Sequence, residues 1–219
     1  MIHCQQIPLI LNHDWNPTIL ALHKLEVISR AAESKSFKSV TTASVGYQEN
    51  HKLGAYGMLS RVGYQENHKL GADEGTVKHN VNPEWIMGRS GIVDKTMPWL
   101  LDLLTAVKDI NPTGYWVGSM KGDVYGHVDN PKDQSALNYI IQCEDESAYT
   151  WIDDGTVKEE YSSTPGTAWL INAQVKHGIS NTGTRHTFSI RFDTPYEIVR
   201  EWFNANSNNL TFGNKENTQ

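Results

Sequence analysis

The chain has little cysteine, no long hydrophobic run and few basic residues. Only Cys4 and Cys143 occur among 219 residues, which excludes a disulfide framework and a multi-cysteine zinc site. The longest early apolar stretch, residues 7–11, is too short for the hydrophobic region of a signal peptide, and no later stretch approaches transmembrane length. We therefore expect a soluble protein of a reducing, cytoplasmic compartment with no membrane partner.

The charge balance is acidic. Lys and Arg number 19 against 25 Asp and Glu, which gives a net charge of −6 and a pI near 5.8. Because nucleic acids and anionic membranes attract basic surfaces, we expect no nucleic-acid partner. Aromatic residues, by contrast, are plentiful: seven Trp, nine Tyr and five Phe supply large side chains for a core. The length suits a single domain over residues 1–219.

Residues 1–112 contain mainly helix signals and form the variable part of this domain. Apolar residues at helical spacing predict a helix over about 18–33, after a possible short strand at 7–11. A second apolar stripe predicts a helix that begins near Thr96 and stops at Asn111-Pro112.

The C-terminal part, residues 194–219, is predicted to hold one helix and a tail. Thr194-Pro195-Tyr196-Glu197 matches a capping box and predicts a helix over about 195–204. The residues that follow are polar, so we expect a frayed tail.

An identical eleven-residue segment, VGYQENHKLGA, occurs at 45–55 and again at 62–72. Two copies are too few for a solenoid, which needs about three or more repeats. His51 and His68 occupy matching positions, which suggests a metal site as one interpretation. A local tandem duplication that forms paired strands or a surface loop is the interpretation we favour, because repeated loop residues need no ligand role.

Residues 113–193 have the pattern of short strands separated by turn residues. Eight strands are predicted there: 113–120, 123–129, 136–143, 148–153, 157–163, 167–172, 176–181 and 185–193. Eight short strands separated by turn residues indicate a double-sheet jelly roll. The expected fold is therefore mainly β, with flanking helices that cover one outer face of a sheet.

Three residues of this core form a candidate metal site. His127 and Asp129 are two positions apart on a predicted strand, so their side chains point to one face. His177 lies on the seventh predicted strand, which is a neighbour of the second in a jelly roll. Two histidines and one carboxylate leave other coordination positions open, as in non-haem Fe(II) oxygenases.

The last predicted strand carries two cations on one face. Arg185, Thr187, Ser189 and Arg191 alternate with apolar residues that would pack on the helices. A buried arginine needs an anionic partner, and a guanidinium binds a carboxylate through paired hydrogen bonds. The partner is either the carboxylate of a ligand or an internal Asp, and the sequence leaves both open.

In this order, these residues resemble the Fe(II)/2-oxoglutarate-dependent dioxygenases, whose core is a double-stranded β-helix. The runs at 127–131, 165–169 and 184–185 are similar to prolyl-hydroxylase-like members, and those at 136–139 and 177–181 to the aspartyl/asparaginyl-hydroxylase-like branch with its small bacterial and phage-type proteins. The resemblance covers 113–193 and excludes the duplicated segment.

The resemblance implies an enzyme that uses Fe(II), 2-oxoglutarate and O2 to hydroxylate an amino-acid side chain, free or in a peptide. It implies no catalytic residue beyond the metal ligands. The residues that it assigns are His127, Asp129 and His177 for iron, Arg185 or Arg191 for the distal carboxylate of 2-oxoglutarate, and Asn138 and Tyr139 for a further polar contact.

Two other functions remain open at this point. A cupin-like protein would bind metal without a 2-oxo acid, although two inward-facing arginines weigh against it. A non-catalytic jelly roll would use its Trp and Tyr residues as a platform for a sugar or peptide.

Overall fold

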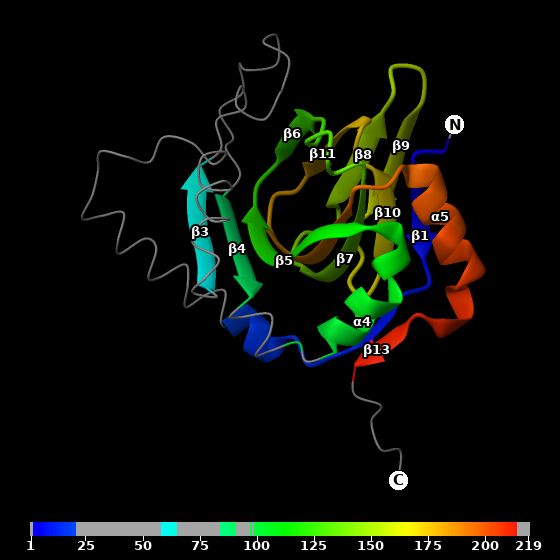
Figure 1. Cartoon of the computed structure of the whole chain (residues 1–219). Coiled ribbons are helices and arrows are strands. Elements are labelled where there is room, and N and C mark those ends of the chain that lie inside the picture. Colours follow the sequence, from blue (N-terminus) through cyan, green and yellow to red (C-terminus); the bar gives the residue numbers. More distant parts are fainter. Residues whose placement is uncertain (1, 21–57, 65–83, 91–96, 98, 214–219) are drawn as a thin grey trace.

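The chain folds around two antiparallel sheets that face each other (Figure 1). The computed structural model describes residues 2–20, 58–64, 84–90, 97 and 99–213. Most of the duplicated segment lies outside these ranges, except that the second copy begins within the strand at Met58–Tyr64. His51 and His68 are among the residues that are not described.

The large sheet has seven strands in the order β1-β10-β7-β12-β5-β4-β3. Its strands are β1 (Cys4–Ile7), β10 (Ala168–Asn172), β7 (Ser135–Cys143), β12 (Thr184–Phe192), β5 (Pro112–Lys121), β4 (Glu84–Ser90) and β3 (Met58–Tyr64). The central strand β12 pairs with β5 on one side and β7 on the other. Strand β12 therefore lies in the middle of the sheet, with a neighbouring strand on each side.

The small sheet has four strands in the order β6-β11-β8-β9. They are β6 (Val124–His127), β11 (Lys176–Ser180), β8 (Tyr149–Asp153) and β9 (Lys158–Ser162). The chain passes back and forth between the two sheets from β5 to β12, which is the topology of a jelly roll. The predicted jelly-roll fold is therefore confirmed, and its second and seventh strands, β6 and β11, are neighbours. The described part of the large sheet adds β1, β3 and β4 to the strands expected between 113 and 193.

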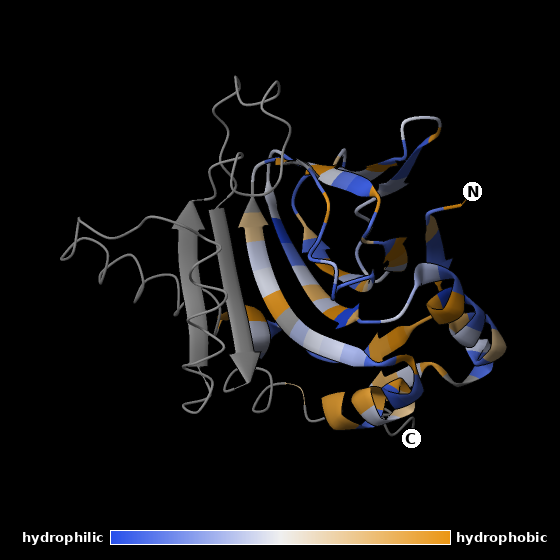
Figure 2. Cartoon of the chain, turned by 45° about the horizontal axis from the view of Figure 1, so that its top comes forward, coloured by the Kyte–Doolittle hydropathy of each residue, from blue (hydrophilic) through white to orange (hydrophobic). Residues whose placement is uncertain are grey.

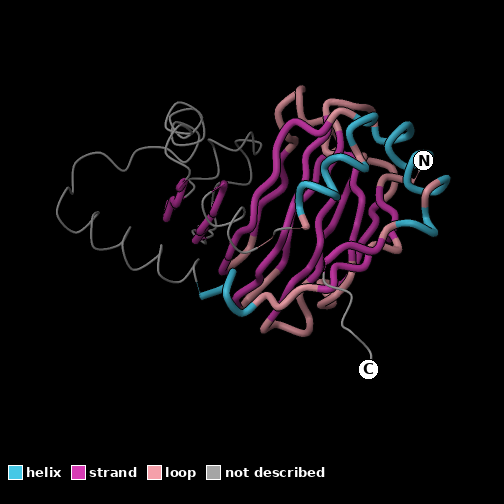
Figure 3. The backbone as a smooth tube through the Cα atoms, turned by 60° about the horizontal axis from the view of Figure 1, so that its bottom comes forward, coloured by secondary structure: helices cyan, strands magenta, loops and turns pink. Residues whose placement is uncertain are grey.

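Two helices lie against the outer face of the large sheet (Figure 3). They are α4 (Leu100–Ala106), which runs into a 3₁₀ turn at Lys108–Ile110, and α5 (Tyr196–Ala205). Helix α4 is coloured mostly hydrophobic in Figure 2. On α5 the buried residues Tyr196, Val199 and Phe203 recur at helical spacing and join the same hydrophobic core as the outward side chains of β12, where the Phe203 ring meets Phe192 edge to face at 6.3 Å between centroids. Burying a side chain such as Phe203 contributes about 1.5–3 kcal/mol.

The observed elements correct several local predictions. The strand expected at 7–11 is divided into β1 and β2 (Ile10–Asn12) around Pro8, because proline has no N–H to donate to a ladder. Residues 16–20 are helical, and the rest of the predicted helix 18–33 lies outside the described residues. Helix α4 begins at Leu100 rather than near Thr96.

The C-terminal prediction is right for the helix and wrong for the tail as far as Gly213, and residues 214–219 lie outside the described residues. Helix α5 starts after Pro195 without a side-chain cap, so the capping box does not form. Instead of fraying, residues after the helix form a 3₁₀ turn at Ser207–Asn209 and then β13 (Thr211–Gly213), which pairs with β2 in parallel. Tertiary pairing with β2 supplies the hydrogen bonds that the polar sequence did not reveal. Among the described residues, no helix has the length and apolar character that crossing a bilayer requires.

Candidate metal centre

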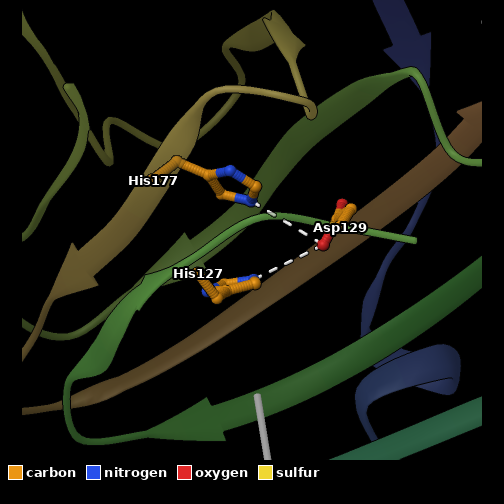
Figure 4. A group of neighbouring side chains, drawn as sticks. All are labelled: His127, Asp129 and His177. Carbon is orange, nitrogen blue, oxygen red and sulfur yellow. Dashed lines mark ion pairs between the residues drawn. The ribbon is translucent and has the colours of Figure 1, made fainter. Parts of the chain in front are cut away.

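The register of two strands brings His127 and His177 together. In the small sheet, His177 of β11 lies directly opposite His127 of β6. Asp129 follows the end of β6, and its N–H donates a hydrogen bond to the carbonyl of Ala173 at 3.0 Å, which ties it to the connection that leads into β11. The three side chains point toward one another (Figure 4).

The ligand atoms of this triad fit one metal ion. One atom from each of the three side chains lies within 4.8 Å of the others. The Asp129 Oδ1 atom is 3.4 Å from His127 Nε2 and 3.8 Å from His177 Nε2. His177 Nδ1 lies 2.8 Å from the Val175 carbonyl, so this nitrogen carries the proton and donates it. The lone pair of His177 Nε2 is then directed at the centre of the triad.

Electrostatics keep two of these ligands in the form that a metal needs. Burial, followed by the neighbouring His127, lowers the pKa of His177 to about 4, so its imidazole is neutral near pH 7. Burial alone would raise the pKa of Asp129, but the Arg191 guanidinium and the two histidines outweigh it and hold that pKa well below its usual range. A neutral imidazole and an ionised carboxylate are the metal-binding forms.

Arg191 forms an internal ion pair with the carboxylate ligand. Its Nη2 atom is 3.1 Å from Asp129 Oδ2, and both side chains are 13% exposed. The pair occupies one carboxylate oxygen and leaves Oδ1 facing the histidines. Of the two partners that the sequence left open for these arginines, the internal Asp is therefore the one observed at Arg191.

A cavity of about 80 Å³ extends from this centre between the two sheets. The small sheet contributes His127, His177 and other residues, and the large sheet contributes the four alternating residues of β12 that the sequence placed on one face. We call the part around the triad and Arg191 the metal end. The part around Arg185, Thr150 and Tyr161 is the buried end.

Arg185 occupies the buried end, where none of the described carboxylates forms an ion pair with it. The residue is 2% exposed, and its Nη1 atom donates to Thr150 Oγ1 at 3.3 Å. Burial lowers the pKa of Arg185, and the groups that oppose this effect are Tyr161 and Cys143. Neither of these is a carboxylic acid. Within the described residues, its Nε atom has no hydrogen-bond partner. A buried cation with an unsatisfied donor is an arrangement to which an anion can bind.

Tyr161 is a residue of this end that the sequence analysis missed. Its ring stacks on Trp169 at 4.4 Å between centroids and 17° between planes, which fixes the hydroxyl near Arg185. Thr150 was missed as well. Both lie on predicted strands, but alternation along β8 and β9 offers two faces, and only the pairing of the sheets decides which one points inward.

The two polar candidates on β7 separate. Asn138 lines the cavity and accepts a short hydrogen bond from Ser189 Oγ. Tyr139 points to the opposite face of the sheet, where it stacks on Trp15 at 5.7 Å. Adjacent residues of a strand face opposite ways, so Asn138 reaches the cavity and Tyr139 lies on the other side of the sheet.

Comparison with known proteins gives structural similarity only. No family model and no curated protein sequence matches the chain. Among solved structures, it is similar to a 2OG-Fe(II) oxygenase family oxidoreductase from Burkholderia pseudomallei, with 11% identity, a TM-score of 0.41, and coverage of 67% of this chain and 89% of the other. A prolyl-4-hydroxylase from Pseudomonas putida matches at 11% identity and a TM-score of 0.39, covering 71% of this chain and 89% of its own.

A cupin superfamily protein from Desulfitobacterium hafniense matches less of the chain. It is 18% identical, with a TM-score of 0.26, and covers 36% of this chain and 68% of its own. Since these three TM-scores are below 0.5, the function has to be argued from the residues of the site. Fold and site together define a jelly roll with a candidate His-Asp-His metal centre.

Proposed function

We propose that the protein is an Fe(II)- and 2-oxoglutarate-dependent oxygenase that hydroxylates an amino-acid side chain, free or in a peptide. The observation that carries this proposal is the combination of two features in one cavity. A His-Asp-His triad lies at the metal end, and a buried arginine without a carboxylate partner among the described residues lies at the other.

The residues at the metal end suit a divalent iron ion. Two imidazole nitrogens and one carboxylate oxygen would hold it through His127, Asp129 and His177, and would leave other coordination positions open. When bound, Fe(II) supplies the redox chemistry that activates O2 together with the 2-oxo acid. The protein holds the three ligands in place: the Val175 carbonyl orients His177, and Arg191 orients Asp129.

The buried end suits the distal carboxylate of 2-oxoglutarate. The Arg185 guanidinium offers its free Nε–H to that carboxylate, and the hydroxyls of Thr150 and Tyr161 lie beside it. A carboxylate there would neutralise a cation that is now 2% exposed. The side chains of His127 and Asp129 are 15% and 13% exposed, so a substrate can approach the metal end from solvent.

The substrate class is supported by sequence motifs. The runs around His127 and His177 resemble those of prolyl- and aspartyl/asparaginyl-hydroxylase-like enzymes, which act on amino-acid side chains. A metal-binding jelly roll of the cupin type, which uses no 2-oxo acid, is the second candidate. It shares the triad but gives Arg185 no role.

Anaerobic titration separates these two functions. Protein loaded with Fe(II) should develop a visible charge-transfer band when 2-oxoglutarate is added without O2. Pyruvate, which keeps the 2-oxo acid group but lacks the distal carboxylate, should give the band only at much higher concentration. Iron binding with no band for either acid would contradict the oxygenase and favour the cupin-like function.

A further inference from the structure

The strand that carries His127 contains a β-bulge next to this ligand. His177 lies opposite His127, and Ile179 lies opposite Val124, so three steps along β6 match two steps along β11. In a regular strand, residues three apart point to opposite faces. Val124 and His127 nevertheless both line the cavity. The extra residue of the bulge is therefore what directs His127 inward.

The outer side of this bulge is covered by the indole of Trp151. Trp151 belongs to β8, where the alternate residues Thr150 and Ile152 are buried between the sheets, and it lies directly opposite Gly178 of β11. A Cβ atom added at Gly178 would lie 2.5 Å from Trp151 Cζ2, and one added at Gly126 would lie 2.5 Å from Trp151 Cη2. The indole thus rests on backbone that lacks side chains at both positions.

Both glycines adjoin metal-ligand candidates. Gly126 precedes His127 in the bulge, and Gly178 follows His177 on the neighbouring strand. The carbonyl oxygen of Val124 also lies close to Gly178. A Cβ atom added at Gly178 would be 2.5 Å from this oxygen, so there is no room for one. One aromatic ring therefore packs against the glycine beside each histidine, on the side opposite the cavity.

We infer that Trp151 is a positioning residue, which fixes the bulge in β6 from outside the barrel and thereby sets the direction of His127 relative to His177. This inference rests on the proposed metal centre. Tight packing allows few alternative backbone arrangements, so a rigid ring across both strands restricts how the two imidazoles can move. Trp151 lies on the side of the small sheet away from the cavity, so it would not touch a bound metal or the substrate.

Cobalt(II) alone is a suitable probe, because its visible absorption reports ligand geometry as well as binding. Trp151→Leu should bind Co(II) about 10-fold to 100-fold more weakly, the range for residues that orient metal ligands, and its absorption spectrum should change. Tyr149→Leu is the matched control. Tyr149 is two residues away on the same strand, opposite Ser180, and does not lie over either glycine. Its variant should keep the affinity and the spectrum of the unmodified protein.

Gly126→Ala tests the same contact between Trp151 and the bulge by changing the glycine instead of the indole. Its added methyl group would displace the indole and also the flexible Lys176 side chain, whose Cε atom would lie 2.6 Å from the new Cβ atom, so Co(II) binding should weaken with Trp151 in place. In the double variant Gly126→Ala/Trp151→Leu, only the flexible end of the Lys176 side chain has to move aside for the methyl group, so part of the lost affinity should return. Circular dichroism and Tm establish that each variant is folded, and Trp151→Phe replaces Trp151→Leu if the latter does not fold.

The outcomes distinguish this inference from the proposed function. Unchanged Co(II) affinity and spectrum in folded Trp151 variants would overturn the inference alone, as would strictly additive losses in the double variant. If the unmodified protein binds no Co(II), the metal centre itself is wrong and the inference falls with it.

Discussion

Arg191 and Arg185 lie on the same face of the same strand, yet their surroundings are opposite. Arg191, at the metal end of the cavity, is paired with Asp129 at 3.1 Å. Arg185, at the buried end, has a threonine hydroxyl at 3.3 Å and no hydrogen-bond partner for its Nε among the described residues. In the part of the chain that the structure describes, β12 therefore carries one arginine paired with a carboxylate and one that has no such partner.

This difference indicates what each end of the cavity binds. At the metal end, the ion pair leaves an oxygen and two imidazole nitrogens turned inward, which is a donor set for a cation. At the buried end, a positive charge whose Nε–H has no partner among the described residues can donate hydrogen bonds to an anion. A metal ion and a 2-oxo dicarboxylate are complementary to these two ends. The four predictions below test the contrast between them.

Removing a ligand from the metal end should have the largest effect. His177→Ala deletes one of three donors, so Fe(II) affinity should fall by more than the roughly 10-fold to 100-fold expected for a residue that only orients a ligand. Titration of the metal-free protein with Fe(II) under argon measures this. His3→Ala, which removes a buried histidine that bonds Asp154 away from the cavity, should leave iron binding intact.

The repeated histidines provide a second control for the same titration. Replacing both His51 and His68 with Ala should leave the iron stoichiometry unchanged. A stoichiometry reduced by half would show that the duplicated segment binds metal and that our interpretation of it is wrong.

Arg185→Ala should weaken 2-oxoglutarate binding at the buried end and leave iron binding at the metal end intact. Deleting one member of a buried charge pair costs about 2–5 kcal/mol, which corresponds to roughly thirtyfold to several-thousandfold weaker 2-oxoglutarate binding. Iron affinity should barely change. Calorimetric titration and succinate formation measure the effect, and Arg185→Lys should restore little because a lysine cannot form the paired hydrogen bonds.

Arg191→Ala, measured in parallel, shows which arginine binds the co-substrate. If this variant alone weakens 2-oxoglutarate binding, Arg191 is the anchor in spite of its ion pair with Asp129. If neither variant weakens it, the oxygenase proposal fails.

Protein stability should respond in opposite ways to the loss of each arginine. Arg191→Met leaves the mostly buried Asp129 without its partner, which should destabilise the metal-free protein by about 2–4 kcal/mol, at or below the range for fully buried pairs. Arg185→Met removes an unbalanced buried cation, so its stability should stay the same or rise. Urea unfolding of the two metal-free variants measures the contrast. Equal destabilisation by both substitutions would show that Arg185 is neutralised by a partner inside the protein.

The smallest effect is expected at the hydroxyl beside Arg185. Tyr161→Phe keeps the ring that stacks on Trp169 and removes only the O–H. One hydrogen bond contributes about 0.5–1.5 kcal/mol, so 2-oxoglutarate binding should weaken roughly twofold to tenfold. Fe(II) affinity should not change. A loss as large as that of Arg185→Ala would mean that the hydroxyl, and not the guanidinium, is the main anchor.

Much of the fold could be predicted from the sequence because its signals are local. Alternation along a strand and turn residues between strands are visible in any short window, and they located the strands that form β5 to β12. The same alternation put Arg185 and Arg191 on one face and the residues that pack under the helices on the other. It could not choose between Asn138 and Tyr139, because either face of β7 was consistent with the pattern.

The sequence by itself determined the jelly roll, the His-Asp-His triad and the inward direction of the two arginines. Only the tertiary structure decided that Arg191 pairs with Asp129, that Thr150 and Tyr161 join Arg185, and that β13 pairs with β2. The physical reason is that periodicity fixes the face on which a side chain lies, whereas the partner of a charge depends on which strands the packed sheets bring within a few ångströms of it.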